Sequence, residues 1–146
     1  MIAYEDRVAL NLLAARDDVD AARIGAVGFS GGGLRAAPLG ATSDKLKARV
    51  VAGMMATYDE LLDKLIVPHT WMLFPPGLGQ VGDVPDLAAC AAPKPLLVQY
   101  ALGDAMFTEK GMRDADNRIA GYYERVSTQP SPETGRRCRL ALQIGG

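Results

Sequence analysis

The stretch that decides the fold runs Arg23-Ile24-Gly25-Ala26-Val27-Gly28-Phe29-Ser30-Gly31-Gly32-Gly33. Its first part is a short apolar run with β-branched residues, which is typical of a buried strand in a parallel sheet. Residues 28–32 then fit the pattern G-x-S-x-G, and small or apolar residues continue to about Leu39. The stretch therefore predicts a buried strand, a tight turn at Ser30 and a short buried helix.

A serine at such a turn has a chemical use. The turn strains the backbone of Ser30 and makes its Oγ project at the carboxyl end of the strand, where open α/β sheets bind ligands. We expect glycine at 28 and 32 because a residue without Cβ lets the strand and the helix approach each other. The Gly31 N–H would open the helix and could stabilise an oxyanion.

Two other interpretations of this turn stay open, a phosphate-binding loop and a turn that only packs. The spacing argues against the first, because the dinucleotide pattern G-x-G-x-x-G would need glycine where Ser30 stands. The lysine of a P-loop is absent from this stretch as well.

Strands and helices alternate along the rest of the chain. The apolar spacing predicts a helix over 4–15, strands over 47–53, 96–101 and 138–144, and a helix that ends near residue 126. Thr57 and Glu60 have the spacing of a capping box for a helix over 58–65. The proline-rich segment 75–95 predicts a long loop with one helical turn near 86–90, and 127–137 reads as a polar loop. This order predicts an α/β domain with a mostly parallel sheet.

Composition places the chain among folded soluble domains and excludes several function classes. Its 146 residues fit one domain, 1–146, and 16 Lys plus Arg against 17 Asp plus Glu give a net charge of −1. This balance argues against a polybasic nucleic-acid partner. No apolar run reaches the roughly 18 residues of a membrane helix. The N-terminus lacks a secretory pattern, so we expect a cytoplasmic location.

Cysteine and histidine content limits the chemistry further. Cys90 and Cys138 lie far apart, and we expect free thiols in the core, with one disulfide as the alternative. A zinc site is excluded on ligand count because His69 is the only histidine. We expect neither a metal nor a cofactor.

A nucleophilic serine needs a base, and an acid that orients the base. Asp104 follows the predicted strand 96–101 at its carboxyl end and is the favoured acid, although it could be an ordinary turn aspartate. Asp83 and Asp86 are weaker rivals because they lie in the loop. His69 lies between Ser30 and Asp104, whereas this architecture orders its triad serine, acid, histidine. We therefore expect His69 and nearby Trp71 to line the substrate site, with His69 as the base as the alternative.

Several motifs accompany the serine turn along residues 4–125. They are Val19-Asp20-x-x-Arg23-Ile24-Gly25, Pro76-Gly77-Leu78, Asp86-Leu87, Ala92-Pro93-Lys94-Pro95-Leu96-Leu97 and Gly103-Asp104-x-x-Phe107. In these motifs the chain resembles the α/β-hydrolases, and among them the dienelactone-hydrolase-like and acetyl-xylan-esterase-like bacterial esterases.

The resemblance implies a fold and an activity. It implies an eight-stranded, mostly parallel sheet, with Ser30 as nucleophile, Asp104 as triad acid and the Gly31 N–H as one oxyanion donor. The implied substrate is a small carboxylic ester, cleaved through an acyl-serine. Dienelactone hydrolases proper use cysteine, so Ser30 favours ester cleavage over lactone opening.

The chain also departs from that family. The serine turn comes early, and no histidine follows the last predicted strand, so we expect a partial α/β-hydrolase fold of three to four strands that lacks the N-terminal ones. Residues 127–146 read as a divergent tail that could hold the last strand. Three interpretations stay open: an incomplete ester hydrolase, a non-catalytic remnant used for binding or assembly, and a subunit completed by a partner chain. The uncovered sheet edge predicts self-association.

Overall fold

The computed structural model describes residues 2–62, 65–128 and 143–145, and strands and helices alternate through them. In chain order the elements are α1 (Ile2–Ala14), the 3-10 turn η1 (Ala21–Arg23), β1 (Gly25–Phe29), α2 (Gly31–Thr42), β2 (Ala48–Ala52), α3 (Tyr58–Leu62), the 3-10 turn η2 (Trp71–Leu73), α4 (Leu78–Val81), α5 (Val84–Ala89), β3 (Leu96–Ala101), α6 (Glu109–Thr128) and β4 (Gln143–Gly145).

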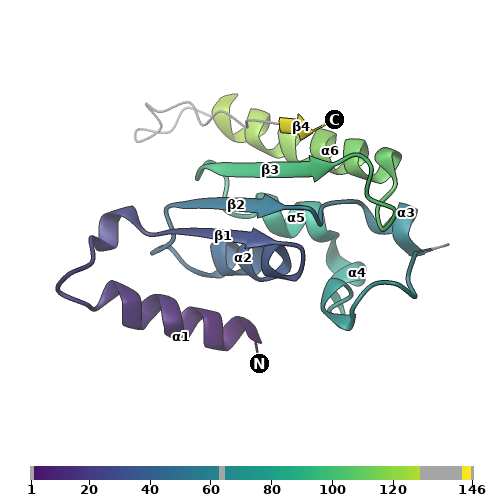
Figure 1. Cartoon of the computed structure of the whole chain (residues 1–146). Helices are drawn as coiled ribbons and strands as arrows, with labels where there is room; N and C mark the ends of the chain where they lie inside the picture. Colours follow the sequence, from purple (N-terminus) through teal and green to yellow (C-terminus); the bar gives the residue numbers. More distant parts are fainter. Residues whose placement is uncertain (1, 63–64, 129–142, 146) are drawn as a thin grey trace.

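The four strands form one parallel sheet in the order β1-β2-β3-β4. All arrows point the same way in Figure 1, so the loops after β1, β2 and β3 meet at one edge of the sheet. The strand predicted over 96–101 is confirmed with those bounds. Of the strand predicted over 138–144, only β4 belongs to the described residues, and 138–142 lie outside them.

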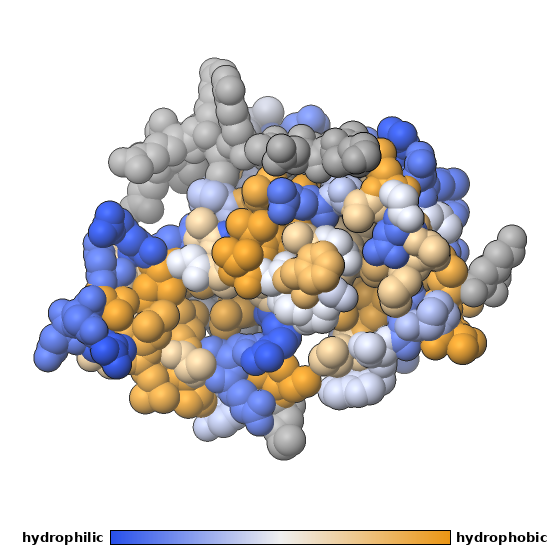
Figure 2. Space-filling model, viewed as in Figure 1, coloured by the Kyte–Doolittle hydropathy of each residue, from blue (hydrophilic) through white to orange (hydrophobic). Residues whose placement is uncertain are grey.

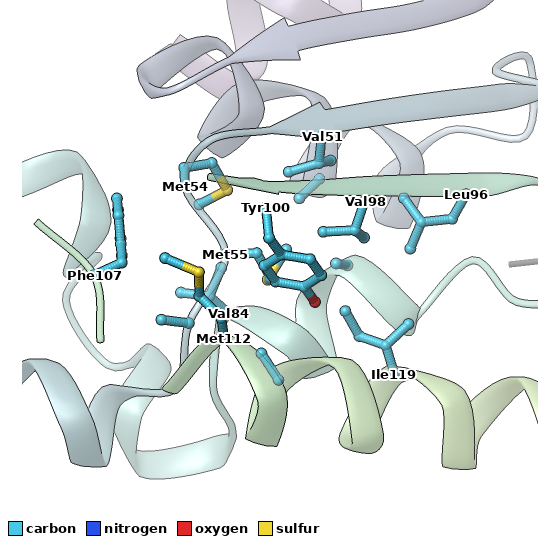
Figure 3. Close-up of a cluster of buried hydrophobic side chains, with 14 of the residues drawn as sticks. Val51, Met54, Met55, Val84, Leu96, Val98, Tyr100, Phe107, Met112 and Ile119 are labelled. Atoms are coloured by element: carbon cyan, nitrogen blue, oxygen red, sulfur yellow. The ribbon is translucent and has the colours of Figure 1, made fainter. Parts of the chain in front are cut away.

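The core lies on one face of the sheet. Val51 of β2 and Val98 of β3 are 0% and 1% exposed, and they belong to a cluster that includes residues of α2, α5 and α6. Figure 3 shows Val98 and Tyr100 of β3 facing Ile119 and Met112 of α6. A second, smaller cluster of Leu10, Ile24 and Leu46 attaches α1.

The opposite face of β1 is open. Val27 and Phe29 are 80% and 75% exposed, so the expectation of a fully buried strand is wrong for these two positions. The described helices α2, α5 and α6 lie behind the sheet in Figure 1, and Figure 2 shows apolar side chains on the front face. Within the described residues β1 pairs only with β2, so it is also an edge strand. Parallel sheets are ordinarily covered on both faces, which makes this surface unusual for a folded domain.

We expect this surface to make the chain self-associate, and Val27→Lys to weaken the association, because a lysine on an edge strand opposes pairing with a second edge. Sedimentation velocity over a range of protein concentrations measures the effect. Val81→Lys in α4 is the matched control, since Val81 is 86% exposed and lies outside the sheet. A monomer at every concentration for the unmodified chain would contradict the expectation.

The proline-rich segment is more helical than expected. It contains α4 and α5 in place of one turn near 86–90. Pro85 lies in the first turn of α5, where a missing N–H costs no helical hydrogen bond. Asp83 and Asp86 form a capping box there, with Val84 N donating to Asp83 Oδ1 at 2.6 Å and Asp83 N to Asp86 Oδ2 at 2.8 Å.

The cap of α3 also differs from the prediction. Thr57 Oγ1 is buried and has no hydrogen-bond partner among the described residues, so the box with Glu60 does not form. Instead the Tyr58 N–H donates to Asp83 Oδ2 at 2.9 Å. Burial raises the pKa of Asp83, although the two backbone donors and Arg118 act in the opposite direction. One carboxylate thus caps two helices, α3 and α5.

Among the helices that the structure describes, none combines the length and apolar character needed to cross a membrane.

Two polar atoms lie inside the core between β3 and α6. Tyr100 Oη and Asp116 Oδ1 are buried, and neither has a hydrogen-bond partner among the described residues. Burial raises the pKa of both side chains, and the charge of Asp116 raises that of Tyr100 further. A carboxyl group whose pKa is raised by folding is held protonated to higher pH in the folded chain than in the unfolded one. Stability therefore falls as pH rises from about 4 through the folded pKa.

Replacing Asp116 by leucine is expected to stabilise the chain by about 1 kcal/mol at pH 7, because it replaces a partly desolvated carboxylate by an apolar side chain with the same branching. The stability of the variant is also expected to lose the decrease above pH 4 that the titration of this carboxyl causes. Urea unfolding at pH 4, 5.5 and 7 measures both effects. Asn117→Leu, at the exposed neighbouring position, serves as the control and should change stability by less than about 0.5 kcal/mol.

Candidate active site

The turn at Ser30 joins β1 directly to α2. Ser30 has φ 51° and ψ −119°, the only positive φ of a non-glycine residue in the described chain. The neighbouring strand and the helix hold this conformation: the Ser30 N–H donates to Ala52 O at 2.8 Å, and the Ser30 carbonyl accepts from Gly33 N at 2.9 Å. The side chain is exposed and makes no capping hydrogen bond to the helix. The hydroxyl is therefore presented outward at the carboxyl end of β1.

The glycines around Ser30 have different roles. A Cβ added to Gly28 would lie 2.1 Å from Gly32 O and 2.5 Å from Gly33 N, so the strand touches the backbone of the helix at this point. A Cβ on Gly32 would meet nothing within 4 Å. The close approach of the strand and the helix therefore requires glycine at 28. The expectation that it also requires glycine at 32 is wrong, because a Cβ at that position has free space. Gly31 is the first residue of α2, where no preceding helical turn supplies a carbonyl for its N–H.

Asp104 lies in the turn that follows β3, at the same edge of the sheet as Ser30, with β2 between their two strands. It is half-buried. Its N–H donates to Ala101 O at 3.1 Å, and its Oδ1 accepts from Met106 N at 2.9 Å. Among the described residues, the carboxylate is therefore held by its own turn and not by a cationic side chain.

Asp83 and Asp86, the other candidates for the acid, have hydrogen-bond partners away from the Ser30 turn. Asp83 caps two helices, and Asp86 pairs with Arg118, whose Nε and Nη2 lie 2.6 Å and 2.5 Å from its two oxygens. Both of these carboxylates therefore have structural tasks in the described chain.

His69 is brought to the Asp104 turn and not to Ser30. Its Nε2 lies 2.8 Å from the carbonyl oxygen of Met106. Its ring packs on Phe107, with ring centroids 4.7 Å apart, and meets the edge of Phe74 at 6.4 Å. No local pattern indicates this contact, because 37 residues separate the two partners.

Two hollows flank the candidate residues. One, of about 350 Å³, is lined by Asp104 with Asp59, Glu60 and Thr108, and also by Leu65, Ala105 and Phe107. The sequence patterns did not predict that Asp59 and Glu60 lie beside Asp104. Their position after β2, the strand next to β3, is the signal that could have suggested this arrangement. The Lys110 ammonium, 2.9 Å away, lowers the pKa of Glu60.

The other hollow is an apolar groove of about 490 Å³ between α1, α2 and the segment that contains η2. Trp71, 73% exposed, and Met72 both line it. Met72 connects the groove to the serine turn, since its Cε lies 3.3 Å from where a Cβ on Gly31 would be. The ion pair between Arg35 and Asp6 joins α2 to α1 at the same groove.

Neither of the expected thiols lies in the described core. Cys90 is free and exposed at the end of α5, so the expectation of a core thiol is wrong for it, and Cys138 lies outside the described residues. Within the described part of the chain, no three His, Cys, Asp or Glu side chains gather as a metal site would require.

Comparison with known proteins gives relatives among hydrolases. No family model matches the chain. The curated protein "Putative hydrolase YtaP" of Bacillus subtilis (strain 168) is 25% identical over 124 residues, which cover 84% of this chain and 42% of that protein. The chain therefore spans less than half the length of this relative.

Solved structures agree on the fold. A glucuronoyl esterase from Solibacter usitatus is 23% identical with a TM-score of 0.68, over 98% of this chain and 43% of that one. A promiscuous CE15 esterase from a marine bacterial metagenome gives a TM-score of 0.69 at 17% identity, over 99% and 42%. The methylesterase BT1017 is 28% identical with a TM-score of 0.56, over 84% and 27%. This chain thus has a partial α/β-hydrolase fold: a parallel sheet flanked by helices that corresponds to less than half of such an enzyme.

Proposed function

We propose that this chain carries the nucleophile and the acid of a serine hydrolase that cleaves small carboxylic esters. The observation that carries the proposal is the backbone of Ser30, whose positive φ between β1 and α2 leaves its hydroxyl exposed at the carboxyl end of the sheet. Strain of this kind persists only where the surroundings enforce it, and Gly28 and the bond to Ala52 do so in this turn.

In the proposed reaction Ser30 Oγ attacks the acyl carbon and gives its proton to a base. The tetrahedral oxyanion accepts a hydrogen bond from the Gly31 N–H at the start of α2. Collapse expels the alcohol and leaves an acyl-serine, which water hydrolyses to the acid. Asp104 orients the imidazole of the base, which we propose comes from polypeptide that completes the sheet, because the hydrogen bond of the His69 ring among the described residues goes to Met106 O and not to Ser30.

The names of the similar structures favour ester substrates, since they refer to a glucuronoyl esterase and a methylesterase. Within the esterases, the motifs around Ser30 and Asp104 favour the dienelactone-hydrolase-like and acetyl-xylan-esterase-like group. The apolar groove beside Gly31 suits an apolar part of the ester, with Trp71 at its wall.

A fluorophosphonate label tests the nucleophile directly. We expect slow covalent modification at Ser30, located by mass spectrometry of the digested chain and absent from Ser30→Ala. Ser43→Ala is the matched control and should label like the unmodified chain. Trp71 is the sole tryptophan, so its emission should change as the label binds. Modification elsewhere, or none at high label concentration, would favour the alternative of a non-catalytic remnant used for binding or assembly.

A further inference from the structure

We propose that His69 is a positioning residue that holds the Asp104 turn through the main chain of Met106. A carbonyl oxygen can only accept a hydrogen bond, so Nε2 of His69, 2.8 Å from Met106 O, must carry the hydrogen. The ring is further held by Phe107, 4.7 Å away between centroids, and by Phe74 at 6.4 Å. The imidazole is thus fixed in one orientation against the turn.

Met106 links this imidazole to the candidate acid. Its N–H donates to Asp104 Oδ1 at 2.9 Å while its carbonyl accepts from His69. Both polar groups of one residue are therefore engaged, one by the carboxylate and one by the imidazole. The turn closes with Phe107 N donating to Asp104 O at 3.3 Å. Fixing Met106 fixes the rotamer of Asp104, because the carboxylate has no cationic partner among the described residues to hold it.

The arrangement leaves the second carboxylate oxygen for another donor. Asp104 Oδ2 accepts no hydrogen bond from the described residues, while Oδ1 is occupied. A triad acid needs one oxygen anchored and the other directed at the imidazole of the base. The catalytic meaning of this contact rests on the proposed function of Asp104, whereas the contact itself rests on the geometry alone.

Substitution of His69 by two residues of different chemistry separates hydrogen bonding from packing. Glutamine places an N–H donor near the position of Nε2, whereas phenylalanine keeps the ring and its contact with Phe107 but cannot donate. We measure hydrogen exchange of the Met106 amide by NMR, with the Met112 amide, bonded to Thr108 O in the next helix, as the internal control for folding. Exchange at Met106 is expected to rise roughly 2- to 12-fold in His69→Phe and to stay near the original rate in His69→Gln. Unchanged protection in His69→Phe, or equal loss in both variants, would overturn the proposal.

A second variant keeps the test decisive if His69→Phe does not fold. Asp104→Ala removes the other partner of Met106, so its amide should exchange faster while the Nε2–H resonance of His69 persists. Loss of that resonance would show that Asp104 holds the imidazole in place. It would overturn the proposal that His69 positions the Asp104 turn. The fluorophosphonate reaction at Ser30 tests the proposed function separately, because labelling of Ser30 does not depend on how fast the Met106 amide exchanges.

Discussion

Replacing Gly28 by alanine is expected to destabilise the chain by about 3 kcal/mol or more, a large share of the stability of an ordinary domain. The new Cβ would lie 2.1 Å from the carbonyl oxygen of Gly32 and 2.2 Å from its carbonyl carbon. These atoms are backbone atoms in the first turn of α2, so no side chain can rotate away. Relief requires α2 to move off the sheet, which breaks the packing of Ala36 and Ala37.

Gly32→Ala is the matched control, with the same change of one methyl group four residues later. Nothing lies within 4 Å of the added atom, and alanine is favoured over glycine in a helix by up to about 1 kcal/mol. We therefore expect unchanged or slightly higher stability. Thermal unfolding of both variants by circular dichroism measures the difference, and equal melting temperatures would show that the strand and helix are not in the contact described.

The second large effect concerns catalysis by the chain alone. We expect turnover of a short-chain nitrophenyl ester below about 10⁻² s⁻¹, roughly a thousandfold under that of a typical enzyme. An attacking serine must give its proton to a general base, and in the serine, acid, histidine architecture that base is a histidine. His69 is the only histidine in the sequence, and its Nε2 donates to Met106 O in a different turn. Residual rate above water would come from the Gly31 N–H and from substrate binding.

His69→Ala and Ser30→Ala test this directly. We expect His69→Ala to change the residual rate by less than about threefold and Ser30→Ala to abolish the part that depends on Oγ. Fast turnover that His69→Ala abolishes would identify His69 as the base and would contradict its role beside Met106. Activity recovered when polypeptide completing the sheet is added would support an interrupted hydrolase.

Local pattern was enough to predict the elements around Ser30. The run Leu96–Ala101 forms a strand with the predicted bounds because its alternate residues, such as Val98 and Tyr100, are buried on one face. The helix after Ser30, predicted to about Leu39, continues to Thr42 in spite of Pro38. Thr42 Oγ1 donates to Pro38 O at 2.7 Å within this last turn. Propensity marks a proline as a helix breaker, and tertiary packing of α2 overrides it.

Hydrogen bonds between residues that are distant in the sequence could not be predicted from local patterns. Thr57 has the spacing of a cap, yet the carboxylate that caps Tyr58 is Asp83, 25 residues away in the chain. His69 next to Met106 is a similar case. The positions of Ser30 after β1 and of Asp104 after β3 could be predicted from the ends of the predicted strands. The contact of His69 with the Asp104 turn could not, because it depends on how two loops pack. The exposure of Val27 could not be predicted either, because the apolar run around it has the same sequence pattern whether or not a second layer of secondary structure covers that face of the sheet.

The strand order of the sheet has a consequence for synthesis. Each of the described strands pairs with the one before it in the chain, so a nascent polypeptide can add every strand to an edge that already exists. No later strand among them has to be inserted between two earlier ones, which keeps the entropy of loop closure low at each step. Domains begin to fold from the N-terminal side as the ribosome releases the chain. Among the described strands, assembly can therefore proceed in chain order from β1 through β2 and β3 to β4.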